Sequence, residues 1–189
     1  MSSTPIEPTM GHDDNIETVS AKRPETPSEY TRRILGYVEG EDPLAVLKTT
    51  AQRLRTIVLN TPASVLRRQP APGRWSPAQI ITHLADAEVV ASYRLRMIIA
   101  HDGVDIQAFD QNEWATNLAY EAADPEESVE LFDVTRRANL SLLRRVDPRR
   151  HDNHGMHSER GRETVKHLIR LYAGHDLNHL GQLERILGV

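Results

Sequence analysis

The sequence predicts an all-α protein, a four-helix bundle preceded by a short leading helix. Four long stretches carry apolar residues at intervals of three and four, the spacing of an amphipathic helix. Three of these stretches open with Asp-Pro or Ser-Pro, which is typical of a helix start. No segment alternates apolar and polar residues as a half-buried strand does, and no repeat is present. A length of 189 residues suits one domain with a proper core.

The N-terminal part predicts a tail followed by the leading helix. Residues 1–24 are rich in Ser, Thr, Pro and Asp and lack apolar periodicity, so we expect a disordered tail before a domain at residues 25–189. Thr26-Pro27-Ser28-Glu29 places Thr at the N-cap, Pro at the first helical position and Glu at the third. This capping box predicts a short helix that extends through Tyr37.

The first two principal helices are predicted from start signals and apolar stripes. Asp42-Pro43 begins the first, which extends to about Asn60. Ser76-Pro77-Ala78-Gln79 is a second capping box, and the helix that it opens ends near Ala100. Trp75 precedes this N-cap in the position of a hydrophobic staple.

The last two principal helices follow a long connection at residues 101–124. Asp124-Pro125 opens the third, and the fourth is expected from about Glu163 to Leu187, with Gly188 as its C-cap. Because a connection of this length is too long for a tight antiparallel turn, it could cross the whole bundle. The second and third principal helices therefore need not alternate in direction.

Composition and charge exclude several classes of function. The net charge is -4 and no Lys/Arg cluster forms a stripe typical of binding to a nucleic-acid backbone, so we expect no nucleic-acid partner. The absence of Cys excludes disulfides, thiolate ligands and a Cys nucleophile, and any thiol chemistry would need an external thiol. No apolar run approaches the length of a membrane span and no secretory signal precedes the domain. We therefore expect a cytoplasmic protein with no membrane partner.

His175 and His179 are the first candidates for a metal site. Residues at i and i+4 share one helix face about 6 Å apart, close enough for two imidazoles to bind one ion. Both fall within the apolar stripe of the last helix, where an imidazole is costly unless its nitrogens are satisfied. The alternative is a pair of partly buried histidines that form hydrogen bonds across the bundle.

His83 is the candidate third ligand, at the edge of the apolar stripe of the Pro77 helix. A single histidine at this position is typical of an ordinary half-buried residue. Beside His175 and His179 it completes a set of three neutral imidazoles, and such a set leaves open coordination positions, as in catalytic metal sites. Three imidazoles suit Zn, Ni, Fe or Cu, so the metal stays open.

Three motifs resemble a known family. Arg74 to Glu88, RWSPAQIITHLADAE, resembles the W-[ST]-x-x-[EQ]-[IV]-x-x-H-[LI]-x-[DE] stretch of DinB-like, YfiT-like metalloproteins. Asp110 to Ala115 is similar to their Y-D-x-x-x-W-[AS] segment, and Leu171 to His179 resembles their closing H-x-x-x-H helix. The motifs occur in the family's order and span roughly residues 43–187. The departure is Phe109, where the family commonly has Tyr, so no hydroxyl role is carried over to it.

The resemblance implies a bundle of up-down-down-up topology and often a homodimer. It also implies one divalent metal ion (Zn, Ni or Fe) held by His83, His175 and His179. The activity implied is that of a metal-dependent enzyme on a small-molecule substrate, either a hydrolase or a transferase of a low-molecular-weight thiol such as bacillithiol or mycothiol. Two other classes remain open, a non-enzymatic metal-binding or interaction protein and a structural helical dimer with metal-free histidines.

Further residues are candidates for a pocket around the metal. Gln182 could orient water or substrate or be a plain polar helix residue, and Asp86 could accept the second N–H of His83 or be solvated. Arg94 could meet an anionic substrate group or be a surface or salt-bridge arginine. Trp114 is expected to pack the long connection onto the bundle and could cap the pocket. His157 matches a histidine often seen before the family's last helix, which suggests the pocket rim.

The loop at residues 147–162 is a weaker candidate for a second metal site. It holds His151, His154 and His157, but we expect no rigid element to fix their geometry. Four arginines close to these histidines would also repel a cation. No Asp or Glu lies plainly on the face of His175 and His179, so the sequence assigns no general base.

Overall fold

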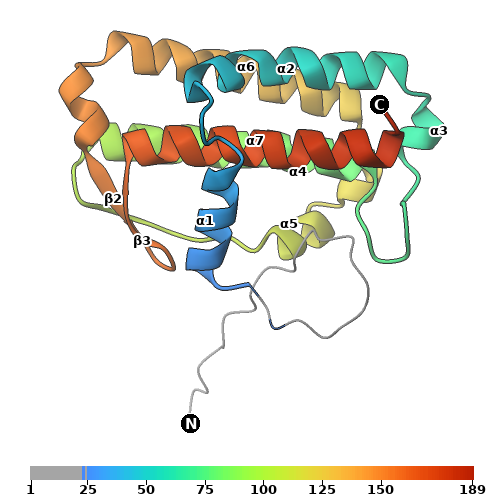
Figure 1. Ribbon diagram of the computed structural model, residues 1–189, viewed down its shortest axis with the longest axis horizontal. Helices are drawn as coiled ribbons and strands as arrows, with labels where there is room; N and C mark the ends of the chain where they lie inside the picture. The colour runs from blue at the N-terminus through green and yellow to red at the C-terminus, as the bar shows by residue number, and fades with distance from the viewer. Residues whose placement is uncertain (1–22, 24) are drawn as a thin grey trace.

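Four long helices form the body of the molecule in two layers. In the computed structural model, which describes residues 23 and 25–189, these are α2 (Pro43–Asn60), α4 (Pro77–Ala100), α6 (Pro125–Arg145) and α7 (Val165–Leu187). α2 and α6 form one layer, and α4 and α7 form the other (Figure 1). α2 packs against α6 and α7, and α4 packs against the same two helices. The predicted tail lies, except for Arg23, outside the described residues.

The direction of the helices is up-down-down-up. α2 and α7 run to the right in Figure 1, whereas α4 and α6 run to the left. The connection between α4 and α6 crosses the length of the bundle before α6 begins. The predicted all-α four-helix bundle is confirmed.

The predicted start signals form the expected caps. Thr26 caps α1 (Pro27–Gly36) and Ser76 caps α4, each in a complete capping box with the Glu or Gln three residues later. The carboxylates of Asp42 and Asp124 accept backbone N–H groups at the starts of α2 and α6. Each cap satisfies N–H donors that the first helical turn leaves without a partner.

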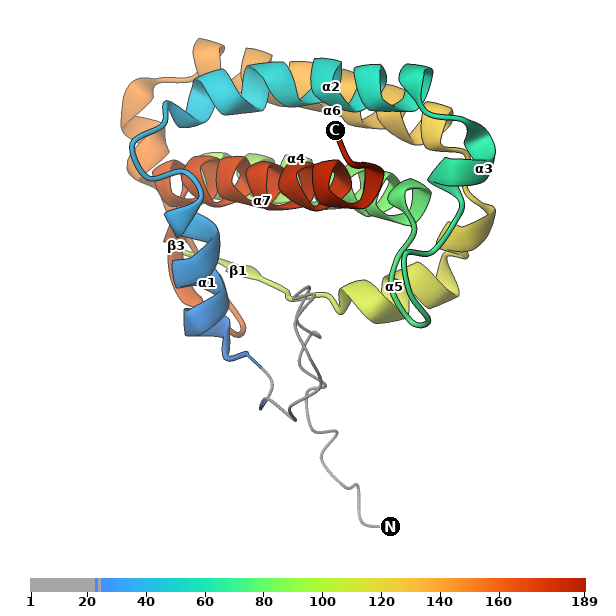
Figure 2. The same cartoon turned by 45° about the vertical axis from the view of Figure 1, so that its right-hand side comes forward.

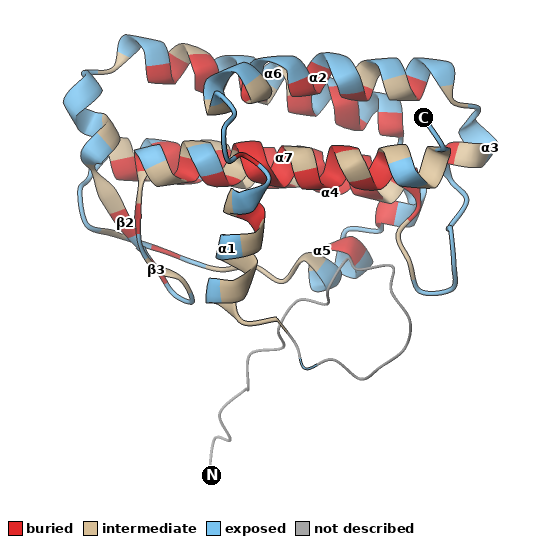
Figure 3. Cartoon of the chain, viewed as in Figure 1, coloured by how far each residue is buried: buried red, intermediate tan, exposed pale blue. Residues whose placement is uncertain are grey.

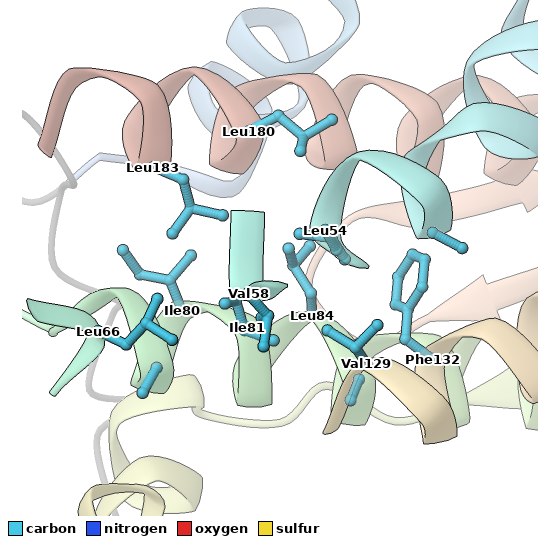
Figure 4. Close-up of a cluster of buried hydrophobic side chains, with 13 residues drawn as sticks. Leu54, Val58, Leu66, Ile80, Ile81, Leu84, Val129, Phe132, Leu180 and Leu183 are labelled. Carbon is cyan, nitrogen blue, oxygen red and sulfur yellow. The ribbon is translucent and has the colours of Figure 1, made fainter. Parts of the chain in front are cut away.

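The main hydrophobic cluster lies between the two layers (Figure 4). Phe132 and Val129 of α6 meet Leu54 and Val58 of α2 there, and the isoleucines and leucines of α4 and α7 complete the cluster. Trp75 packs against its edge, as expected of a hydrophobic residue before an N-cap. The full set of buried members is Ala51, Leu54, Val58, Leu66, Ala78, Ile80, Ile81, Leu84, Ala85, Val129, Phe132, Leu180 and Leu183.

A small three-stranded sheet, which no sequence pattern predicted, lies at one end of the bundle. β1 (Val104–Ile106) pairs in parallel with β2 (His154–His157), which pairs antiparallel with β3 (Gly161–Thr164). Strands of three or four residues are too short to show an alternating pattern. A Cβ added at Gly155 would lie 2.2 Å from Cδ1 of Ile106, so this glycine leaves room for the buried Ile106 side chain.

The start of the last helix also differs from the prediction. α7 begins at Val165 rather than Glu163, because Glu163 and Thr164 belong to β3. The Thr164 hydroxyl then caps α7 by accepting the backbone N–H of His167. The short η2 (Pro148–Asp152) precedes β2 within what was predicted to be a loop.

A second set of short elements covers the α4–α7 layer on the side away from α2 and α6 (Figure 2). It comprises α1, the sheet, α5 (Gln111–Asn117) and η1 (Tyr120–Ala122), while α3 (Ala63–Leu66) follows α2. Figure 3 shows that α7 is largely buried along its middle, with α1 lying against it. Within the described part of the chain, no helix combines the length and apolar character needed to cross a membrane.

Candidate metal centre

Three imidazoles converge where α4 meets α7. His83 of α4 is 1% exposed, and His175 and His179 of α7 are 8% and 2% exposed. The Nε2 atoms of His83 and His175 lie 3.1 Å apart, and one ring nitrogen from each of the three residues lies within 4.8 Å of the others. The structure therefore brings together the three histidines that the sequence singled out.

The surrounding elements bury this face of the two helices. Gly174 allows α1 to approach, since a Cβ there would lie 2.1 Å from the carbonyl oxygen of Ile34. On the α4 side, the ring of Trp75 lies 5.1 Å from that of His83. His83 was expected at the edge of an apolar stripe, but the surrounding elements bury its side chain almost completely.

Burial makes these imidazoles suited to ligation. It lowers the pKa of His83 and the pKa of His175 well below the ordinary value, and the adjacent imidazoles act in the same direction. The two rings are therefore neutral at pH 7, which is the form that binds a metal ion.

The hydrogen bonds of the three rings leave room for an ion. Among the described residues, the Nδ1 atoms of His83 and His175 are buried without a partner. Nδ1 of His179 lies 2.9 Å from Oε1 of Gln182, which fixes that ring when Nδ1 carries the proton and leaves its Nε2 lone pair free. Two nitrogens bound to one ion at about 2.0–2.1 Å lie roughly 3 Å apart, as the Nε2 atoms of His83 and His175 do. The donor set fits a divalent ion with three protein ligands.

Gln182 and Asp86 have roles that differ from those of cavity residues. Gln182 is buried, contacts His179 and is not among the residues that line the adjacent cavity. Of the two roles considered for Asp86, the hydrogen bond from His83 is absent, since the Asp86 carboxylate accepts the hydroxyl of Tyr120 at 2.7 Å.

A cavity of about 330 Å³ adjoins the three histidines. Its walls come from α1, α4, α7, the connection around Phe109 and the turn between β2 and β3. This volume suits a small molecule. The walls include apolar side chains such as Leu171 and charged ones such as Arg33, Arg94 and Arg160.

Arg94 lines this cavity and is buried. It is 5% exposed and donates to the carbonyl of Gln107 at 2.6 Å and to the hydroxyl of Tyr172 at 3.4 Å. Its guanidinium carbon lies 5.8 Å from the centre of the Phe109 ring. The alternative of a surface or salt-bridge arginine was wrong, since Arg94 is buried and forms no ion pair with a described residue.

Trp114 and His157 do not line the cavity, but each contacts a residue that does. The ring of Trp114 packs 4.6 Å from that of Phe109, so it packs the connection as expected, but it is not a lining residue. His157 is 3% exposed and also does not line the cavity. Its Nδ1 accepts the backbone N–H groups of Glu159 and Arg160, and burial lowers its pKa to about 4.

Sequence reasoning missed a second buried polar cluster, inside the bundle. Arg136 of α6 contacts Asp176 of α7 at 2.6 Å and Glu88 of α4 at 2.8 Å, and Nδ2 of Asn139 donates to Glu88 at 2.7 Å. Burial opposes the charge of Arg136, but Asp176 and Glu88 outweigh it and raise the pKa of Arg136. Charges of opposite sign at buried stripe positions of three helices were the available signal.

The sequence of this chain is similar to those of known proteins. Residues 47–183 match the family model of the DinB superfamily. The chain belongs to the DinB superfamily. It is 30% identical over 145 residues to "Putative metal-dependent hydrolase OB0782" of Oceanobacillus iheyensis, a match that covers 77% of this chain and 80% of that protein. It is 27% identical over 146 residues to "Putative metal-dependent hydrolase GK0616" of Geobacillus kaustophilus, covering 77% and 82%.

A solved structure shares the fold of this chain. YfiT from Bacillus subtilis, described as "a probable metal-dependent hydrolase with an unusual four-helix bundle topology", superposes with a TM-score of 0.69 at 20% identity. The match covers 92% of this chain and 95% of that one. The likeness supports the up-down-down-up arrangement described above.

Proposed function

We propose that this DinB superfamily protein is a metal-dependent hydrolase of a small molecule, with one divalent ion held by His83, His175 and His179. The observation that carries the proposal is the convergence of three buried imidazoles at one wall of a cavity. The names of its relatives support the same reaction class. A bound divalent ion would polarise a substrate oxygen or lower the pKa of bound water toward neutrality.

The residues of the chain supply positioning and exclusion of solvent. Gln182 accepts the Nδ1–H of His179 and so presents its Nε2 toward the other two rings. α1 and the connection around Phe109 form walls of the cavity beside the site, and the three imidazoles are largely shielded from solvent. Arg94 and Tyr172 stand on the cavity wall beside the histidines, where they can contact a bound molecule.

Other expectations from the sequence remain predictions. Transfer of an external low-molecular-weight thiol uses the same metal and cavity, so an added thiol belongs in every activity assay. A homodimer and a cytoplasmic location are proposed on the resemblance and on the sequence alone.

The first experiment is the metal content of the purified, untagged protein. We expect about one equivalent per chain by elemental analysis, and loss of that metal in each of His83→Ala, His175→Ala and His179→Ala. His154→Ala is the matched control and should keep the metal, because His154 lies in β2, pairs with Asp102 and does not line the cavity. Retention of stoichiometric metal in His175→Ala would contradict the proposed site.

The second experiment tests the reaction. The metal-loaded protein is assayed against ester and amide panels, with and without an added thiol, before and after removal of metal by a chelator. We expect turnover that is lost with the metal and recovers when the metal is restored. Stoichiometric metal without turnover of any compound would instead favour the non-enzymatic metal-binding protein.

A further inference from the structure

Arg94 is a buried cation with no carboxylate partner. Its side chain is 5% exposed, yet among the described residues no Asp or Glu oxygen lies within 4.0 Å of its guanidinium. Its two hydrogen bonds go to neutral acceptors, the Gln107 carbonyl and the Tyr172 hydroxyl. A buried charge without a counter-charge is costly, so this position favours an anion from outside the chain.

Two other arginines that line the cavity, unlike Arg94, each have a carboxylate partner. Arg33 pairs with Glu25 at 2.8 Å, and Arg160 pairs with Glu163 at 2.7 Å. Asp110, Glu113 and Glu159 also line the cavity, but none of them reaches Arg94. Glu113 and Glu159 are exposed, so their charges are screened by solvent.

The position of Arg94 relative to the histidines sets the shape of a ligand. The ring of Tyr172 lies 6.5 Å from the ring of His175, and its hydroxyl accepts a hydrogen bond from Arg94. The Tyr172 ring therefore separates Arg94 from the three histidines along one cavity wall. A ligand that spans it would place its anionic end at Arg94 and its other end at the histidines.

We propose that Arg94 and Tyr172 bind a carboxylate group of the small molecule that occupies this cavity. The assignment of that molecule as a substrate rests on the proposed hydrolase function, but the anion site itself does not. A guanidinium fork matches the two oxygens of a carboxylate, and N–H groups of Arg94 remain after its two hydrogen bonds. Because the Tyr172 oxygen accepts from Arg94, the Tyr172 hydroxyl hydrogen is free to point at the same anion.

A single unpaired cation favours a singly charged group. A phosphate dianion would leave one negative charge without a partner, in a cavity whose wall already contains the half-buried carboxylate of Asp110. We therefore expect carboxylates to bind and inorganic phosphate to bind more weakly.

The test compares benzoate with benzamide, which has the same shape and no charge, by calorimetric titration of the metal-loaded protein. Wild type should prefer benzoate, and Arg94→Gln should weaken benzoate by about 10-fold or more while leaving benzamide unchanged. Arg170→Gln is the control, since Arg170 is an exposed arginine of α7 outside the cavity. Equal benzoate affinity in wild type and Arg94→Gln would overturn the proposal.

The same titration without metal separates this site from the metal centre. A carboxylate can also bind directly to a metal ion, but such binding would disappear with the metal and would not depend on Arg94. Benzoate binding that persists without metal and falls in Arg94→Gln supports the proposal, even if the hydrolase function fails. Binding that needs the metal and ignores Arg94 overturns it and leaves the hydrolase function standing.

Tyr172→Phe is the second variant, and it keeps the test decisive if Arg94→Gln does not fold. It removes only the hydroxyl and should weaken benzoate severalfold without affecting benzamide. Unchanged benzoate affinity in this variant would contradict the role of the Tyr172 hydroxyl. Tighter binding of inorganic phosphate than of benzoate would overturn the assignment of a carboxylate.

Discussion

Two buried polar clusters stand on the same two helices, one on each side of the α4–α7 layer. Inside the bundle, Arg136 lies between Glu88 and Asp176, and every charge has a partner within 2.8 Å. On the other side, His83 and His175 each have a buried ring nitrogen without a partner among the described residues. His175 and Asp176 are neighbours in sequence, yet each belongs to a different cluster.

The difference shows how a structural cluster can be told from a functional one. Burial of polar groups is tolerated when each donor meets an acceptor, and the Arg136 cluster meets this condition with protein atoms alone. The histidine cluster does not, and it opens on a cavity. We interpret the first as an internal brace of the bundle and the second as a site that is completed by an external ion.

The largest expected effect comes from breaking the closed cluster. Arg136→Met should lower the free energy of unfolding by about 3–5 kcal/mol, because it leaves Glu88 and Asp176 buried without their cation. Urea denaturation measures this loss. The control is the triple variant Arg136→Met, Glu88→Leu, Asp176→Leu, which should recover much of the stability because no unpaired charge remains. A single variant as stable as wild type would show that the cluster is not a brace.

The histidine cluster should respond in the opposite way when no metal is present. His83→Leu removes a buried ring with an unsatisfied nitrogen, so the metal-free variant should be as stable as wild type or more stable. Added Zn²⁺ should stabilise wild type by about 2.7 kcal/mol at a free concentration 100 times its dissociation constant, and should not stabilise His83→Leu. Thermal denaturation with and without Zn²⁺ measures both. A destabilised metal-free variant would indicate that this cluster is structural too.

The same comparison explains which parts of the fold and of the candidate site could be predicted from the sequence. The bundle was predictable because Pro43, Pro77 and Pro125 follow capping residues, and because the apolar stripes define one buried face on each helix. The histidine set was predictable because the i, i+4 spacing of His175 and His179 places both rings on one helix face regardless of tertiary detail.

The cover over the histidines was not predictable in the same way. It is built from the connection around Phe109, from strands of three or four residues and from α1, none of which has a strong periodic signal. The burial of Arg94 and of His83 depends on that cover, so sequence periodicity could place them only at the edge of a stripe. The Asp86 hydrogen bond was misassigned because its partner, Tyr120, lies in a separate short 3-10 helix.

A smaller effect is expected at His179, whose Nδ1 forms a hydrogen bond with Gln182. Gln182→Leu removes the acceptor of the His179 Nδ1–H and should weaken metal affinity by about 10–100-fold. Gln182→Glu keeps an acceptor oxygen at this position and should retain most of the affinity. Competition with a metal-sensitive dye measures the affinities. Equal affinity in Gln182→Leu and wild type would remove Gln182 from the metal centre.

The smallest effect, counted per pH unit, is expected at His157, a buried polar group that belongs to neither cluster. Its Nδ1 accepts two backbone N–H groups and its Nε2 has no partner among the described residues, so the folded protein holds this ring neutral. Burial lowers its pKa to about 4, whereas an unfolded histidine has a pKa of about 6.5. Between these values the unfolded chain takes up a proton that the folded protein excludes.

Stability should therefore be fully present above about pH 6.5 and fall as the pH decreases toward 4. The contribution of His157 to this fall is at most about 1.4 kcal/mol per pH unit, the value for one proton. His157→Gln should flatten the curve of unfolding free energy against pH by up to that amount, measured by urea denaturation of chelator-treated protein. Because both proteins retain the three metal-site histidines, their titration cancels in the difference. If the unfolding free energies of wild type and His157→Gln depend on pH in the same way, the folded protein can bind a proton at His157. The ring of His157 would then not be held neutral, although its Nε2 is buried without a partner among the described residues.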